Sequence, residues 1–166
     1  MAIPVFSIVG RSGSGKTTLL ENLIPEMRRR GYRVAVIKHH PHPGAALDVE
    51  GKDTWRLAQV GADHVVLVAP DQVMHRRRVE REPSLAEVVA EIRDVDLILT
   101  EGFKQGDAPK IQVSRGEVQP ELVCPPDKLV AVVSDQRLDV GVPQFDPEDV
   151  GGLADLIVEV YGLAGS

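Results

Sequence analysis

The chain begins with a glycine-rich segment that leaves few options for the fold around it. The segment VGRSGSGKTTLL fits the pattern G-x-x-x-x-G-K-[ST] with Gly10, Gly15, Lys16 and Thr17. Glycines let such a loop turn so that consecutive backbone N–H groups point at one anion. The lysine adds a positive charge that reaches the outer phosphates, and the hydroxyl can ligate Mg²⁺. The pattern therefore predicts a phosphate-binding loop.

The flanking residues predict the structural context that this loop requires. Residues 3–9 are apolar and partly β-branched, which predicts a buried strand. Residues 17–30 carry leucines at helical spacing, and a helix there would direct its positive dipole end at the same phosphates. The nucleotide-binding residues predicted in the loop, with Lys16 also predicted to be catalytic, are Gly10, Ser12, Gly13, Ser14, Gly15, Lys16, Thr17 and Thr18.

The rest of the chain alternates between strand and helix patterns. Strands are predicted at residues 32–38, 63–69, 96–100, 110–114 and 129–133, with helices at 54–60, after 83 and after 146. This alternation predicts an α/β fold of the P-loop NTPase type, a mostly parallel sheet with helices on both faces. Residues 72–79 are polar enough to predict an exposed hairpin or edge strand. Because no linker separates these elements, residues 1–166 are expected to form a single P-loop nucleotide-binding domain.

Three local signals refine the helix boundaries. Pro25 lies inside the first predicted helix and is expected to kink or shorten it. Asp53 is expected to cap the helix at 54–60. Ser84 and Glu87 have the spacing of a capping box for the next helix.

A carboxylate is needed near the metal of a nucleotide site, and the strand DLILTEG offers two. Asp96 and Glu101 lie about 16 Å apart at the usual rise of a strand. Ligands of parallel sheets bind beyond the carboxyl ends of the strands, so Glu101 is on the correct side and Asp96 is not. We expect Glu101 to be catalytic, by holding Mg²⁺ or positioning an attacking water. Gly102 is expected to let the backbone approach the terminal phosphate.

The loop after the second strand carries three further candidates: His39, His40 and Asp48. Adjacent residues of an extended segment point to opposite sides, so His39 and His40 would diverge, and no cysteine pair supports a metal site. We therefore expect this loop to contact a substrate or partner. Asp48 is a candidate for a switch that folds over phosphate.

Composition limits the class of partner. The formal net charge is −6, which argues against a general role with nucleic acid or at a membrane surface, and no apolar run reaches membrane-spanning length. The one cysteine, Cys124, excludes an internal disulfide and fits a reducing cytoplasm.

Seven segments in order resemble the MobB family of molybdopterin-guanine dinucleotide biosynthesis. They are GRSGSGKTTLLENLIP, RVAVIKHHPH, GKDTWRLAQVGAD, VVLVAP, LILTEGFK, PKIQVSR and VAVVSDQ. The resemblance implies a GTP-binding homodimer with weak GTPase activity that assists a MobA-type guanylyltransferase in joining GMP to molybdopterin. Molybdopterin or its carrier is a further expected partner. By position, Gly13 to Thr17 would bind phosphates, Thr17 and Glu101 would serve Mg²⁺ or water, and Lys38 and Lys104 lie in the flanking motifs IKH and EGFK.

The usual guanine motif N-K-x-D is absent from the chain. Guanine presents two donors on one edge, and one carboxylate accepts both. Asp135 follows the strand at 129–133 on the correct side of the sheet, so we expect it to select guanine.

Three alternatives stay open at this point. A small-molecule kinase would use residues 75–82, HRRRVERE, as a lid over the phosphates. A metal-delivery GTPase would bind its ion at the histidines of HHPHP. A non-enzymatic adaptor would bind nucleotide and partner without turnover.

Overall fold

The computed structural model of the protein describes residues 2–116 and 121–163. The chain divides into two compact units, one formed by residues up to His39 and from Val88 onward, the other by His40–Glu87. The prediction of a single domain over residues 1–166 stays a prediction. Among the described residues, no helix is long and apolar enough to cross a membrane.

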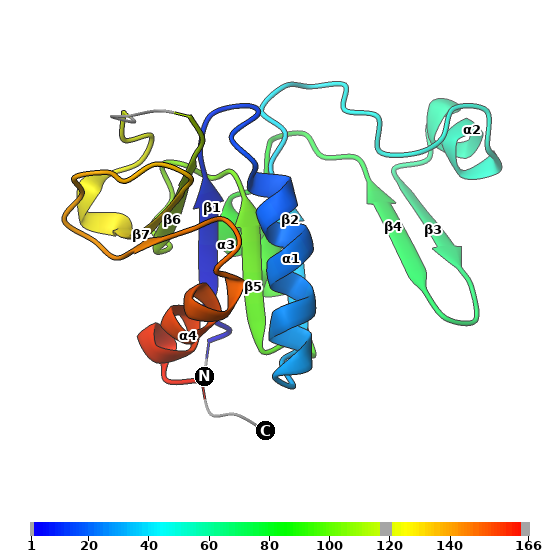
Figure 1. The fold of residues 1–166 in the computed structure, drawn as a ribbon. Coiled ribbons are helices and arrows are strands. Elements are labelled where there is room, and N and C mark those ends of the chain that lie inside the picture. Colours follow the sequence, from blue (N-terminus) through cyan, green and yellow to red (C-terminus); the bar gives the residue numbers. More distant parts are fainter. Residues whose placement is uncertain (1, 117–120, 164–166) are drawn as a thin grey trace. The chain divides into compact units, whose positions relative to one another are not determined.

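The first unit is built on a six-stranded sheet in which every neighbouring pair of strands is parallel (Figure 1). Its strand order is β2-β5-β1-β6-β7-β8. The strands are β1 (Val5–Val9), β2 (Val34–Lys38), β5 (Leu97–Glu101), β6 (Lys110–Ser114), β7 (Leu129–Ser134) and β8 (Gln144–Phe145). The parallel sheet is confirmed. Strand β8 was not predicted, because two residues are too short to carry an alternating pattern.

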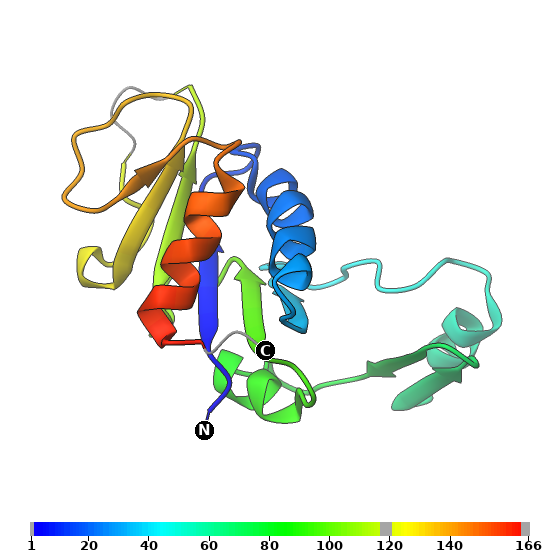
Figure 2. The ribbon, with the colours of Figure 1, turned by 60° about the horizontal axis from the view of Figure 1, so that its bottom comes forward.

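Two helices, α1 (Lys16–Arg29) and α4 (Val150–Tyr161), lie side by side on one face of this sheet (Figure 2). Their apolar sides pack on alternate residues of the strands, since side chains of a strand alternate between faces. Side chains that are completely buried in this core include Phe6, Ile8, Leu23, Met27, Leu97, Leu99, Ile111, Leu153 and Ile157.

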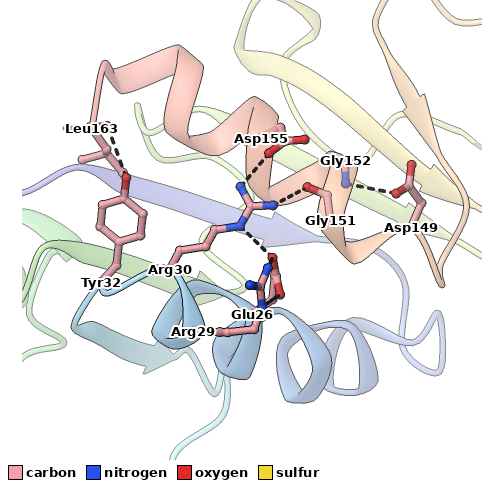
Figure 3. A network of polar contacts seen from close by, with 9 residues as sticks. All are labelled: Glu26, Arg29, Arg30, Tyr32, Asp149, Gly151, Gly152, Asp155 and Leu163. Atoms are coloured by element: carbon pink, nitrogen blue, oxygen red, sulfur yellow. Dashed lines mark hydrogen bonds and ion pairs between the residues drawn. The ribbon is translucent and has the colours of Figure 1, made fainter. Parts of the chain in front are cut away.

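A polar network ties the two helices together at their solvent side (Figure 3). The guanidinium of Arg30 donates to the carboxylates of Glu26 and Asp155 and to the carbonyl of Gly151, at 2.7, 2.6 and 3.0 Å. Pro25 lies on the exposed side of α1, and the helix continues past it to Arg29, so the expected shortening is wrong, while the expected kink stays a prediction.

Described loop residues, among them Gly106, Ala108 and Val123, cover the opposite face of the sheet beside β6. Lys110 is fully buried there and donates to the carbonyls of Gly106 and Ala108, both at 2.7 Å. Gln112 is also buried and accepts from the backbone N–H of Val123 at 3.0 Å. The short 3₁₀ helix η1 (Pro126–Lys128) follows this covering segment. Loop backbone carries many polar groups, which accounts for the polar residues inside β6.

The second unit contains the helix α2 (Asp53–Gln59) and an antiparallel hairpin of β3 (His64–Val68) and β4 (Val73–Arg77). The exposed hairpin is confirmed, whereas the expectation that residues 63–69 join the parallel sheet is wrong. A tight turn joins β3 directly to β4, and in this turn the N–H of Ala69 donates to the carbonyl of Gln72 at 2.8 Å. Arg76 and Arg77, which belong to the lid of the kinase alternative, are strand residues of this hairpin.

Helix boundaries in and near this unit test the two remaining local signals. The N-cap position of α2 is Lys52 and Asp53 is the first helical residue, so the predicted cap is one residue off. The capping box before α3 (Leu85–Glu91) is confirmed, because the Ser84 N–H donates to Glu87 at 2.8 Å and the Glu87 N–H donates to the Ser84 hydroxyl at 3.3 Å.

Candidate functional site

The glycine-rich loop lies between β1 and α1, as the sequence predicts. Gly10 is required by close packing, because a Cβ there would lie 2.5 Å from the backbone oxygen of Val113 and 2.5 Å from the Ser14 hydroxyl. Gly15 precedes the helix with φ +97°, a left-handed conformation that favours glycine. The sequence thus shapes a compact loop against the end of β6, with the start of α1 directed at its mouth.

Two polar side chains of this loop, those of Lys16 and Ser14, suit the binding of an anion. The ammonium of Lys16 donates to the carbonyls of Arg11 and Gly10 at 2.7 and 3.2 Å, so it lies over the loop. The hydroxyl oxygen of Ser14 is buried without a hydrogen-bond partner among the described residues. A buried hydroxyl without a partner costs free energy, which a bound phosphate oxygen would relieve.

Thr17 and Glu101 meet across the site. The Thr17 hydroxyl lies 3.2 and 3.1 Å from the two carboxylate oxygens of Glu101, at the carboxyl end of β5. Two adjacent oxygen ligands of an octahedral Mg²⁺ lie about 3 Å apart, given metal–oxygen distances of about 2.1 Å. The pair therefore fits a Mg²⁺ ion, which usually takes one or two protein oxygens and completes its shell with water and phosphate.

A second lysine approaches the same carboxylate, and a third affects Lys16. The Nζ of Lys38, at the end of β2, is 3.7 Å from Oε2 of Glu101, whose side chain is only 14% exposed. The pKa of Lys16 is lowered mainly by burial and further by the charges of Lys104 and Lys38, while Glu101 opposes this shift. Lys16 thus lies within the electrostatic range of one carboxylate and of two further ammonium groups.

The segment after Glu101 is packed closely on the end of β2. A Cβ added at Gly102 would lie 3.0 Å from Cβ of His39, and the Gly102 N–H donates to the carbonyl of Ile8 at 3.0 Å. The rings of His39 and Phe103 lie 4.8 Å apart, and Phe103 has φ 54°, which is uncommon for a bulky residue. Gly102 therefore serves close packing here, and its N–H is already bonded.

A cavity of about 480 Å³ adjoins the loop on the side of β6 and β7. Its lining includes Ser14, Gly15 and Thr18 from the loop and helix, and Asp135 after β7. One oxygen of Asp135 accepts the Gly116 N–H at 2.8 Å. Asp135 thus combines a turn contact with a position beside the phosphate loop.

Asp146 was missed by sequence reasoning, although it lines the same cavity. It follows β8, whose two residues gave no strand signal, and it was counted only as the start of the last helix. One of its oxygens accepts the Glu148 N–H at 2.9 Å.

The histidine and acid candidates of the second unit have local partners. A ring nitrogen of His40 lies 2.9 Å from the carbonyl of His42. Asp48 accepts the Val49 N–H at 2.7 Å, and the nearby Thr54 side chain is the main cause that lowers the pKa of Asp48. Within residues 2–116 and 121–163, no three His, Cys, Asp or Glu side chains group as metal ligands.

The parallel sheet and the loop between its first strand and first helix define a P-loop NTPase fold. Residues 5–135 match the family model MobB, described as molybdopterin guanine dinucleotide synthesis protein B. The chain belongs to the MobB family.

Individual relatives agree over nearly the full length. The chain is 39% identical over 158 residues to a molybdopterin-guanine dinucleotide biosynthesis adapter protein of Haemophilus influenzae, covering 93% of this chain and 88% of that protein. It is 36% identical over 163 residues to the adapter protein of Escherichia coli, covering 95% and 93%. A crystal structure of molybdopterin-guanine biosynthesis protein B superposes with a TM-score of 0.72 at 32% identity, covering 94% of this chain and 99% of that one.

Proposed function

We propose that this protein binds GTP with Mg²⁺, hydrolyses it slowly, and acts as an adapter in molybdopterin-guanine dinucleotide biosynthesis. Its partners would be a MobA-type guanylyltransferase and molybdopterin or its carrier, in the cytoplasm. The observation that carries the nucleotide site is the contact of Thr17 with both oxygens of Glu101 beside the ammonium of Lys16. The adapter role rests on the family and on the printed names of the relatives.

Each part of the site has a separate task in this proposal. The loop N–H groups and Lys16 hold the β- and γ-phosphates, and Thr17 and Glu101 hold Mg²⁺. The ion supplies positive charge against the phosphate oxygens. Glu101 also orients the attacking water, a task that acts on the transition state. The guanine base occupies the cavity beside the loop, where the carboxylate of Asp135 accepts from both donors of the guanine edge and one of its oxygens also keeps the Gly116 N–H.

A homodimer is part of the proposal. The hairpin exposes Val66, Val68 and Val73 to 44, 72 and 55%. In the strand register these three residues share one face, because side chains alternate along each strand. A second copy of the chain is the proposed cover of this face.

The decisive experiment is a binding titration of GTP and ATP in the presence of Mg²⁺. We expect GTP to bind and ATP to bind more weakly, and Lys16→Ala to lose both nucleotides while its melting profile stays close to that of the parent. Lys128→Ala, a lysine remote in sequence from the loop, is the matched control. Unchanged GTP affinity in Lys16→Ala would remove the P-loop assignment.

Base selection is tested by Asp135→Asn. The amide keeps one acceptor and gains a donor, so GTP affinity should fall and xanthosine triphosphate, whose C2 oxygen accepts, should gain. A bidentate contact of this kind discriminates by about 1–3 kcal/mol. If neither affinity moves, Asp135 only forms the turn with Gly116.

The adapter role is tested by measuring GTP turnover with and without a MobA-type enzyme. Stimulated guanylyl transfer at low GTPase turnover supports it. Phosphate transfer to a small molecule would favour the kinase alternative instead.

A further inference from the structure

Glu101 is shared by two neighbours that approach it from different strands. Thr17 contacts both carboxylate oxygens from the side of β1, and Lys38 lies 3.7 Å from Oε2 on the side of β2. The register places Lys38 directly beside Glu101, and Glu101 beside Ile8 of β1. The three side chains therefore form a row along the carboxyl edge of the sheet.

The strand order gives this row a direction. The cavity proposed for the nucleoside lies toward β6 and β7, and the phosphate loop follows β1. A nucleotide that enters from the cavity extends its phosphate chain away from β7, toward β5 and then β2. The terminal phosphate is thus the group nearest to Glu101 and Lys38, while the inner phosphates lie in the loop.

The net charge of the side chains near Lys16 also favours binding of the terminal phosphate. Lys38 and Lys104 are each close enough to act on Lys16, with Glu101 as the opposing charge, which leaves a surplus of two positive charges near Lys16. A nucleoside triphosphate with its Mg²⁺ carries roughly two negative charges, and the diphosphate carries about one fewer. The cluster is therefore neutralised by the triphosphate complex and keeps a positive charge with the diphosphate.

We propose that Lys38 binds the terminal phosphate and makes the site selective for triphosphate over diphosphate. This inference rests on the proposed nucleotide site. Lys38 exchanges its ion pair with Glu101 for one with the γ-phosphate, while Glu101 turns to the metal. Binding of GTP then replaces one set of charge contacts by another, so the largely buried carboxylate of Glu101 keeps a partner while the exposed Lys38 gains the phosphate.

The test measures dissociation constants for GDP and for a non-hydrolysable GTP analogue. We expect Lys38→Met to weaken the triphosphate about tenfold or more and GDP less than about twofold, since a hydrogen bond to a charged group is lost only in the first case. Lys104→Met should act in the same direction and less strongly. Lys128→Met is the control, and melting curves verify that each variant is folded.

A second pair of variants separates direct contact from an effect through Glu101. In the Glu101→Gln background, Lys38→Met should still lower the triphosphate-to-diphosphate preference. Loss of the Lys38 effect in that background would show that Lys38 only positions Glu101, and would overturn the proposal.

The remaining outcomes distinguish this inference from the proposed function. If the parent binds no guanine nucleotide, the proposed function fails. If the parent binds the triphosphate and Lys38→Met leaves the preference unchanged, only the present inference fails. If Lys38→Met binds a pterin phosphate more weakly but keeps the nucleotide preference of the parent, Lys38 contacts a second substrate. That result would also overturn the present inference.

Discussion

Strands β5 and β3 are both rich in branched apolar residues, yet they have opposite surroundings. In β5, LILTE, the first four residues are buried, whereas in β3, HVVLV, only Val65 is buried. Strand β5 is hydrogen-bonded to β2 on one side and β1 on the other. Within the described part of the chain, strand β3 pairs with β4 alone. The comparison teaches that a run of apolar residues predicts a strand. Whether the faces of that strand are buried depends on the elements that pack against it in the fold.

The ends of the two strands differ as well. Strand β5 ends at Glu101, whose side chain contacts Thr17 and Lys38. The carboxyl end of β3 leads into the turn that starts β4. A site needs a rigid support. The buried strand β5 provides this rigid support for the candidate site, whereas the exposed strand β3 provides a surface for the proposed homodimer.

The largest expected effect comes from truncating a leucine in each strand. Leu99 is 0% exposed and Leu67 is 50% exposed. Leu99→Ala should lower the free energy of unfolding by about 2–5 kcal/mol, because it removes buried atoms and leaves a cavity. Leu67→Ala should cost less than about 1 kcal/mol at protein concentrations that keep the chain monomeric. Denaturant titrations measure both, and equal losses would break the comparison.

The second effect concerns the strand end. Glu101→Gln should lower kcat for GTP by about a hundredfold or more and change Kd much less, because a carboxylate that orients water acts mainly on the transition state. Asp96→Asn, at the opposite end of the same strand segment, is the matched control and should keep the parent kcat. Parent values of both constants in Glu101→Gln would reduce Glu101 to a strand-end acid.

Much of this site was predictable from sequence because the signals were local. The loop residues follow from spacing alone, and Glu101 follows from the rule that ligands bind beyond the carboxyl ends of parallel strands. Asp146 could not be found in this way, since its strand has two residues. The pairing of residues 63–69 with the predicted exposed hairpin, and the loop cover over Lys110, were missed because both depend on which segments meet in space.

The third effect tests whether the uncovered hairpin face is an interface. Val66→Lys places a charge among Val68 and Val73 and should weaken the proposed homodimer at least about tenfold. Val60→Lys is the control, since Val60 follows α2 and is 85% exposed. Sedimentation at micromolar concentration measures both variants. A parent that stays monomeric at that concentration would leave β3 uncovered and would remove the homodimer.

The smallest effect concerns helices α1 and α4, whose apolar residues share one core with Leu97 and Leu99 of β5. Hydrogen bonds from Arg29 and Arg30 lower the pKa of Glu26 from 4.5 to about 2 (Figure 3). A carboxyl whose pKa is lower in the folded state stabilises that state above its unfolded pKa. This contribution should be fully present above about pH 4.5 and should be lost as the pH falls toward 2.

Glu26→Gln should therefore lower the melting temperature slightly at neutral pH and flatten its decline between pH 4.5 and about 2. Glu21→Gln, an exposed glutamate of the same helix, is the control for charge alone. The network is solvent-exposed on the Arg29 side and is screened there, so added salt should reduce the difference between Glu26→Gln and the parent. An acid profile of Glu26→Gln that overlays the parent would mean that packing alone holds α1 against α4.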